Sequence, residues 1–220
     1  LAIVAIMAYL VAGIAPSVAA DNSLPKLLAQ FPQAIRRLFG DPRAYRYLVD
    51  LFIQGKWLQF MPLLAGIYGV ISAMGIMARE IDRRSADFVL TLPVRRSLVL
   101  FARFTALAVN LALLYLGSVA VLWLGLRQVH LPASVGNYAL FSLGHYFPSL
   151  FFAALALYLS LRLDDYAAAN RYSLIGVVGF YALYLILNGV GAPRLASLTF
   201  YGLVNAEQVV GRGHFPWLDV

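Results

Sequence analysis

The sequence contains no cysteine among its 220 residues. It can therefore form no disulfide, no thiolate metal site and no cysteine nucleophile. Charged residues are also scarce, at 12% of the chain against about a quarter in a typical soluble domain, while hydrophobic residues make up 62%. This composition excludes a soluble domain and predicts an integral membrane protein. The apolar runs are continuous rather than alternating, which favours helices over a barrel.

Catalytic and nucleotide-binding motifs are missing as well. No GxxxxGK[ST] phosphate loop occurs, so the chain does not bind ATP by that route. His130, His145 and His214 lie far apart and outside HExxH spacing, and there is no Gly-x-Ser-x-Gly elbow. No ionisable residue lies near the middle of an apolar run, where an ion-coupled carrier would keep one. We therefore expect no catalytic residue, no metal and no cofactor in this chain, and an energy source on a partner.

Five apolar runs are long enough to cross a bilayer, since about 20 residues cover a hydrocarbon core about 30 Å thick. The predicted spans are 1–20, 57–78, 98–126, 138–161 and 172–190. The fold class is thus all-α, a polytopic helical membrane protein. Because the first run begins at Leu1 without a basic segment, and the number of spans is odd, we expect further chain before Leu1 and after Val220.

Two segments between and after these spans are predicted to stay outside the membrane. Residues 21–56 are interrupted by proline and glycine, and their apolar residues recur at helical spacing opposite basic ones. This pattern is typical of interfacial amphipathic helices, although a plain connector is the alternative. Residues 191–220 are more polar, have a re-entrant character, and contain no run long enough to cross; we expect them on the outer side.

The segment 79–96, REIDRRSADFVLTLPVRR, is the most charged part of the chain. Its eight ionised side chains would cost about 20 kcal/mol or more at the bilayer centre, so the segment must lie outside the membrane. An apolar group lies between the charges and ends at a proline. This group consists of Phe88, Val89, Leu90, Leu92 and Pro93. The pattern predicts a short amphipathic helix that docks on a soluble protein; a solvated turn is the alternative.

Basic residues divide almost evenly between the two sides of the membrane when the predicted loops are compared. The densest cluster close to span ends lies at residues 79–103. Because cytoplasmic loops carry an excess of Lys and Arg, this cluster favours a cytoplasmic location for the segment 79–96. Basic residues in loops beside spans suit anionic membrane lipid, and they do not indicate nucleic-acid binding.

Residues 31–96 resemble permease subunits of type-2 ABC exporters. Those subunits carry an acidic stretch followed by an LLxLPxxR pattern, which here is FVLTLPVRR with Pro93 and Arg96. The upstream FPQAIRRLFG is similar to the family's outer segment between its first two spans. Two features depart from the family: Arg84-Ser85 replaces a common Gly-Thr, and five spans are visible rather than six.

The resemblance implies a dimeric channel, in which this chain pairs with a second permease copy or a paralogue. Separate ATP-binding ABC ATPase subunits, carrying ATP and Mg²⁺, would dock on the segment 79–96. The residues implied in docking are Glu80, Asp82, Arg84, Asp87, Phe88, Leu90, Leu92, Pro93 and Arg96. A secondary cytoplasmic contact would be the loop residues Arg162, Asp164, Asp165 and Arg171.

The resemblance also implies that the second and fifth spans line a central cavity. The candidate lining residues, which recur at four-residue spacing, are Tyr68, Ser72, Phe180, Tyr184 and Asn188. Ordinary helix packing is the alternative for all of them. The resulting hypothesis is a multi-pass permease in the cytoplasmic membrane of a prokaryote that exports an apolar or amphipathic cargo, such as a lipid, drug or peptide. The alternative is a non-transporting membrane scaffold or assembly factor that recruits a soluble protein.

Overall fold

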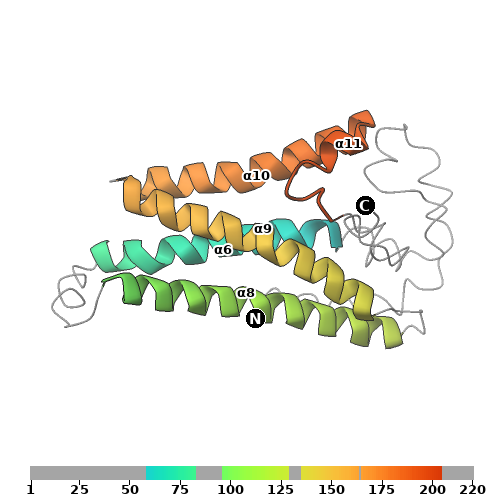
Figure 1. Cartoon of the computed structure of the whole chain (residues 1–220), viewed down its shortest axis with the longest axis horizontal. Coiled ribbons are helices and arrows are strands. Elements are labelled where there is room, and N and C mark those ends of the chain that lie inside the picture. The colour runs from blue at the N-terminus through green and yellow to red at the C-terminus, as the bar shows by residue number, and fades with distance from the viewer. Residues whose placement is uncertain (1–57, 83–95, 129–134, 164, 205–220) are drawn as a thin grey trace.

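The computed structural model describes residues 58–82, 96–128, 135–163 and 165–204. Within these residues the long helices are α6 (Leu58–Asp82), α8 (Arg96–Gln128), α9 (Val135–Arg162) and α10 (Tyr166–Val190), followed by the short α11 (Pro193–Ala196). The long helices run roughly along one axis (Figure 1), and no strand occurs among the described residues. The predicted span 1–20 and the predicted interfacial helices in 21–56 lie outside the described residues.

Three helical stretches are long and apolar enough to cross a membrane. They are Ser97–Leu124, Val135–Arg162 and Tyr166–Val190. The stretch Gln59–Gly75 within α6 is a shorter apolar helix. The chain is therefore a polytopic helical membrane protein, as the sequence predicts.

Each described helix extends beyond its predicted span. The backbone hydrogen bonds of a helix continue into charged residues at the membrane surface, so α6 reaches Asp82 and α8 begins at Arg96. The largest difference between the predicted and the observed helices concerns residues 162–171, which were predicted to form a charged loop. This stretch is mostly helical, because α10 begins at Tyr166 rather than at residue 172.

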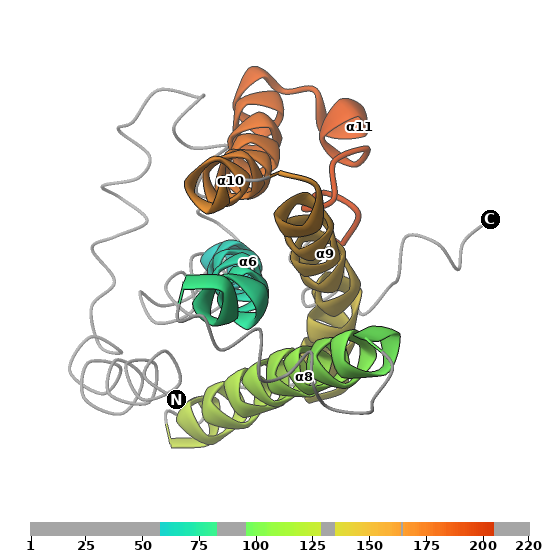
Figure 2. The ribbon, with the colours of Figure 1, turned by 90° about the vertical axis from the view of Figure 1, so that its left-hand side faces the viewer.

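Helix α6 lies among α8, α9 and α10 when the bundle is viewed along its length (Figure 2). Its most extensive neighbour is α9. Small residues make this close approach possible: a Cβ added at Gly69 would lie 3.3 Å from both the Ala153 Cβ and the Ser149 carbonyl oxygen. Buried side chains from the long helices complete one shared core, formed by residues such as Val70, Leu111, Phe152 and Val177.

The chain folds back into the bundle after α10. Gly191 ends that helix with φ 83°, a left-handed conformation that favours glycine, and its N–H donates to the Asn188 carbonyl at 3.1 Å. Beyond α11 a series of turns returns along α9, where Tyr201 and Val204 are buried. A Cβ at Gly144 of α9 would overlap Val204. The described part of the predicted outer segment is therefore packed against the helices.

Filling the contact between α6 and α9 should destabilise the bundle. We expect Gly69→Leu to lower the free energy of unfolding by about 1–3 kcal/mol, since the new side chain must displace Ala153 and the α9 backbone. The matched control is Gly179→Leu on α10, where an added Cβ meets nothing within 4 Å. Thermal midpoints of the purified variants in detergent would test this, and equal midpoints would contradict the packing.

Candidate functional site

Three of the predicted ATPase-docking residues lie in described helices, at one end of the bundle. Glu80 and Asp82 belong to the last turns of α6, and Arg96 begins α8. The segment 79–96 therefore does not begin as a separate element, because α6 continues through Asp82. The other docking residues lie outside the described part of the chain: Arg84, Asp87, Phe88, Leu90, Leu92 and Pro93.

The turn between α9 and α10 lies at the same end of the bundle as the α6 and α8 ends (Figure 1). The structure thus brings Arg162, Asp165 and Arg171 to the side on which residues 83–95 connect α6 to α8. Asp164 lies outside the described residues.

Asp165 has a structural role in this turn. It is the N-cap of α10, and its Oδ1 accepts a hydrogen bond from the Ala167 N–H at 2.8 Å. Its Oδ2 lies 3.9 Å from Nη2 of Arg171, and both side chains are largely exposed, so the ion pair is weak. Asp165 therefore fixes the start of α10, and its part in a cytoplasmic contact stays a prediction.

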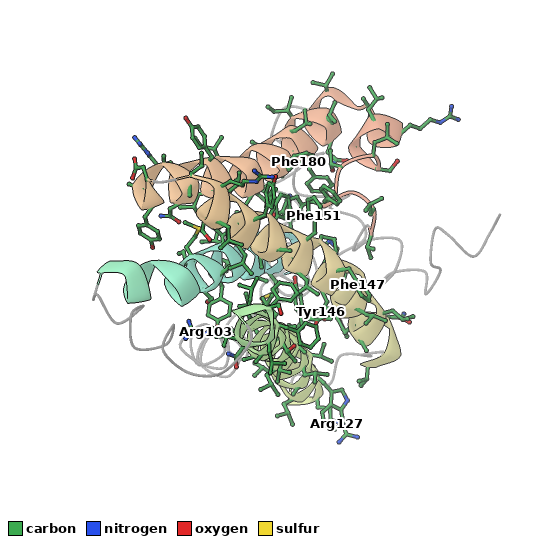
Figure 3. The ribbon with its side chains drawn as sticks, turned by 60° about the vertical axis from the view of Figure 1, so that its left-hand side comes forward. Arg103, Arg127, Tyr146, Phe147, Phe151 and Phe180 are labelled. Carbon is green, nitrogen blue, oxygen red and sulfur yellow. The ribbon has the colours of Figure 1, made fainter. Side chains whose placement is uncertain are left out.

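Arginine–aromatic contacts mark both ends of the spanning helices. The Arg162 guanidinium lies 5.6 Å from the centre of the Tyr158 ring, at the end of α9. At the opposite side of the membrane, Arg127 lies 4.4 Å from the Trp123 ring in the last turn of α8 (Figure 3). Such contacts are typical of headgroup-level anchors.

The five predicted cavity residues do not form one open lining within this chain. The Phe180 ring contacts Phe152 and Phe200, with ring centres 5.9 and 5.5 Å apart, on the α9 side of α10. Tyr68 and Tyr184 pack against the buried core. Ser72 and Asn188 are partly buried, and Asn188 donates to the Tyr184 carbonyl of its own helix at 3.0 Å. In this single chain Tyr68, Phe180 and Tyr184 contribute to helix packing. The role of all five residues in a cavity between two copies stays a prediction.

A buried polar cluster joins α8 to α9, and sequence patterns do not identify it. The hydroxyls of Tyr115 and Ser149 lie 2.8 Å apart, and they lie 3.1 and 3.0 Å from the His145 carbonyl oxygen. The His145 ring lies 3.1 Å from the Phe141 carbonyl through Nδ1 and also bonds to the backbone of Tyr201. The partners outside α9 are Tyr115 on α8 and Tyr201 in the segment after α11, and no residue spacing within α9 indicates them.

Further contacts in this region are also uncharged. Tyr146 reaches across to α8 and donates to the Ala108 carbonyl at 3.2 Å (Figure 3). In the described part of the chain, no group of three His, Cys, Asp or Glu side chains could hold a metal ion. The interior can therefore hold helices together and offer neutral hydrogen-bonding groups.

Comparison with known proteins identifies the family. The family model described as "ABC-2 family transporter protein" matches residues 1–205. No curated protein and no solved structure matches the chain significantly. The match covers all of the described helices and agrees with the motif in the segment 79–96.

The cap at Asp165 can be tested directly. We expect Asp165→Ala to weaken the first turn of α10 by about 1 kcal/mol, because the Ala167 N–H loses its acceptor. Asp165→Ser should retain most of the stability, since serine also caps helices. The measurement is hydrogen exchange at residues 166–170. Equal protection in the alanine and serine variants would show that the cap has no effect.

Proposed function

Since the chain belongs to the ABC-2 transporter family, and is thus a membrane permease of an ABC transporter, we propose that it exports an apolar or amphipathic cargo. The energy comes from separate ATPase subunits that hold ATP and Mg²⁺. Two permease chains, identical or paralogous, work with two such subunits in the cytoplasmic membrane of a prokaryote. The cargo is a lipid, a drug or a peptide.

The observation that carries this proposal is the position of the docking segment relative to α6. Residues 83–95 connect the end of α6 to the start of α8, and α6 in turn packs against α8, α9 and α10. A push on this connection therefore reaches every long helix of the described bundle through one central element. ATP-driven closure of the ATPase subunits would tilt α6 and α8 and switch the side on which the cavity opens.

The character of the helices supports an apolar or amphipathic cargo. Described polar side chains in the bundle interior, such as Tyr115, Ser118, His145 and Ser149, carry hydroxyl or imidazole groups rather than carboxylates or amines. Aromatic side chains are abundant around them, including Phe152, whose ring lies 6.1 Å from that of Tyr201. Surroundings of this kind favour ligands without an unpaired charge.

Loss of the apolar group within the segment 79–96 should separate the ATPase from the permease. We expect the double variant Phe88→Asp, Leu92→Asp to insert normally and to lose nearly all co-purifying ATPase, because two buried carboxylates would be unpaired at the interface. The matched control is Leu195→Asp, Leu198→Asp, which changes two exposed leucines at the other end of the bundle. Retention of the ATPase by the first variant would reject docking through this segment. Cargo-stimulated ATP hydrolysis in vesicles distinguishes an exporter from a scaffold.

The absence of natural cysteine allows the orientation to be measured cleanly. In intact cells, a membrane-impermeant maleimide should label Ser197→Cys and leave Ser85→Cys unlabelled until the membrane is permeabilised. Ser197 is exposed and directly follows α11, which lies at the end of the bundle opposite the connection from α6 to α8 (Figure 1). Labelling of Ser85→Cys in intact cells would place the docking segment outside, and docking of a cytoplasmic ATPase would be impossible.

A further inference from the structure

A polar side chain at the middle of α8 makes no hydrogen bond to any described residue. Asn110 is the fourteenth residue of the 28-residue membrane-spanning stretch Ser97–Leu124. Its side chain is exposed on the surface of the bundle. A carboxamide has N–H donors and a carbonyl acceptor, and hydrocarbon offers a partner to neither. An amide at this depth therefore indicates contact with a polar group outside the described part of the chain.

Polar side chains elsewhere in the spanning helices show two ways in which this fold satisfies such a group. Asn188 donates to the Tyr184 carbonyl of its own helix at 3.0 Å. Tyr115 and Ser149 instead contact each other across two helices, with hydroxyl oxygens 2.8 Å apart. Asn110 makes neither kind of contact among the described residues. Its partner is therefore expected on the outer side of α8.

The residues in register with Asn110 form a heptad seam on the outer surface of α8. Spacings of four and three residues alternate along the seam, which keeps its members on one face of a helix in a left-handed pair. Each member is exposed or partly exposed. The members are Ala106, Asn110, Leu113, Gly117, Ala120 and Leu124. The pattern is that of a helix whose partner lies along this face.

The described bundle uses the other face of α8. This helix lies at the edge of the bundle (Figure 2). Its inward face holds Leu107, Leu111 and Leu122, which are at most 3% exposed. In contrast, Leu113 and Leu124 of the heptad seam are 60% and 53% exposed. The described helices thus cover one face of α8 and leave the face that carries the amide open.

A second copy of this chain supplies a partner of the required chemistry. A twofold axis along the membrane normal places every residue at the same depth as its copy. Asn110 near such an axis therefore meets the Asn110 of the second copy. Each amide can then donate to the carbonyl oxygen of the other, because a carboxamide is complementary to itself. A single asparagine in a heptad seam also specifies the register and the number of helices that pair.

We propose that α8 pairs with α8 of a second, identical chain along the heptad seam, and that the two Asn110 side chains hydrogen-bond to each other at the middle of the membrane. The presence of two permease chains in one complex rests on the proposed function. The inference adds the helix and the residue at which they meet. It also favours an identical partner over a paralogue, because the seam is complementary to its own copy.

Cysteine crosslinking tests the heptad seam, since the chain has no natural cysteine. Membranes that contain the permease and its ATPase are oxidised with copper phenanthroline, and the permease is separated on a denaturing gel. Asn110→Cys and Leu113→Cys should each give a covalent homodimer. The matched control is Leu116→Cys, outside the seam, which replaces a leucine that is 65% exposed and should remain monomeric. No homodimer at the two seam positions, or equal crosslinking at all three, would overturn the proposal.

The amide pair is tested by the affinity between two chains. Asn110→Leu should raise the dimer dissociation constant about three- to twentyfold, as for hydrogen bonds between helices in a membrane, and Asn110→Gln should keep most of the affinity. The constant is measured by fluorescence energy transfer between labelled permease–ATPase complexes diluted in lipid vesicles. Val109→Leu changes an exposed neighbour outside the seam and should have no effect. An unchanged constant in Asn110→Leu would reject the amide pair.

Other occupants of the heptad seam give different results. If the predicted span 1–20 covers it, Asn110→Cys should crosslink to Gly13→Cys within one chain without a homodimer. If lipid covers it, no crosslink should form, and Asn110→Leu should raise the thermal midpoint. Either result overturns the proposal. The homodimer crosslink should persist in Phe88→Asp, Leu92→Asp, so failure of this pairing is distinguishable from failure of ATPase docking.

Discussion

The close contact between α6 and its neighbours is the constraint on which the rest of the described structure depends. Gly66 and Gly69 keep one face of α6 free of side chains, so Tyr201, Val177 and the α9 backbone can approach it. In a bilayer, helices gain little from burying apolar surface against each other, because lipid is equally apolar. Close packing and interhelical hydrogen bonds must therefore supply the association. Here the glycines of α6 permit close packing, and the Tyr115–Ser149 contact supplies a hydrogen bond between α8 and α9.

Apolar run length was enough to predict the fold class and the approximate positions of the described helices. Their ends were not predictable in the same way, because helical hydrogen bonds do not stop where hydrophobicity stops. Asp165 illustrates the point: the carboxylate that made residues 162–171 look like a loop is the group that begins α10. Composition identifies where the chain is apolar, while capping determines where a helix starts.

The candidate site was predictable only in part for a similar reason. The motif in the segment 79–96 was recognisable because its residues are close in sequence. The cluster of Tyr115, His145 and Ser149, and the meeting of Tyr181 with Tyr201, each join separate elements. No local spacing indicates these contacts. The meeting of the two tyrosines also depends on how far the returning segment enters the bundle, which Gly144 and Gly66 allow.

The turn between α9 and α10 has a mechanical consequence. Only residues 163–165 separate Arg162 from Tyr166, and the Asp165 cap fixes the start of the second helix. Two long helices joined by so short a turn cannot slide past each other independently, so α9 and α10 move as one helical hairpin. The returning segment also packs against both helices near their middle, where the Phe200 ring contacts Phe152 of α9 and Phe180 of α10. A conformational cycle of this permease would then have few independent moving parts, and α6 and α8 would shift against a hairpin that keeps its own shape.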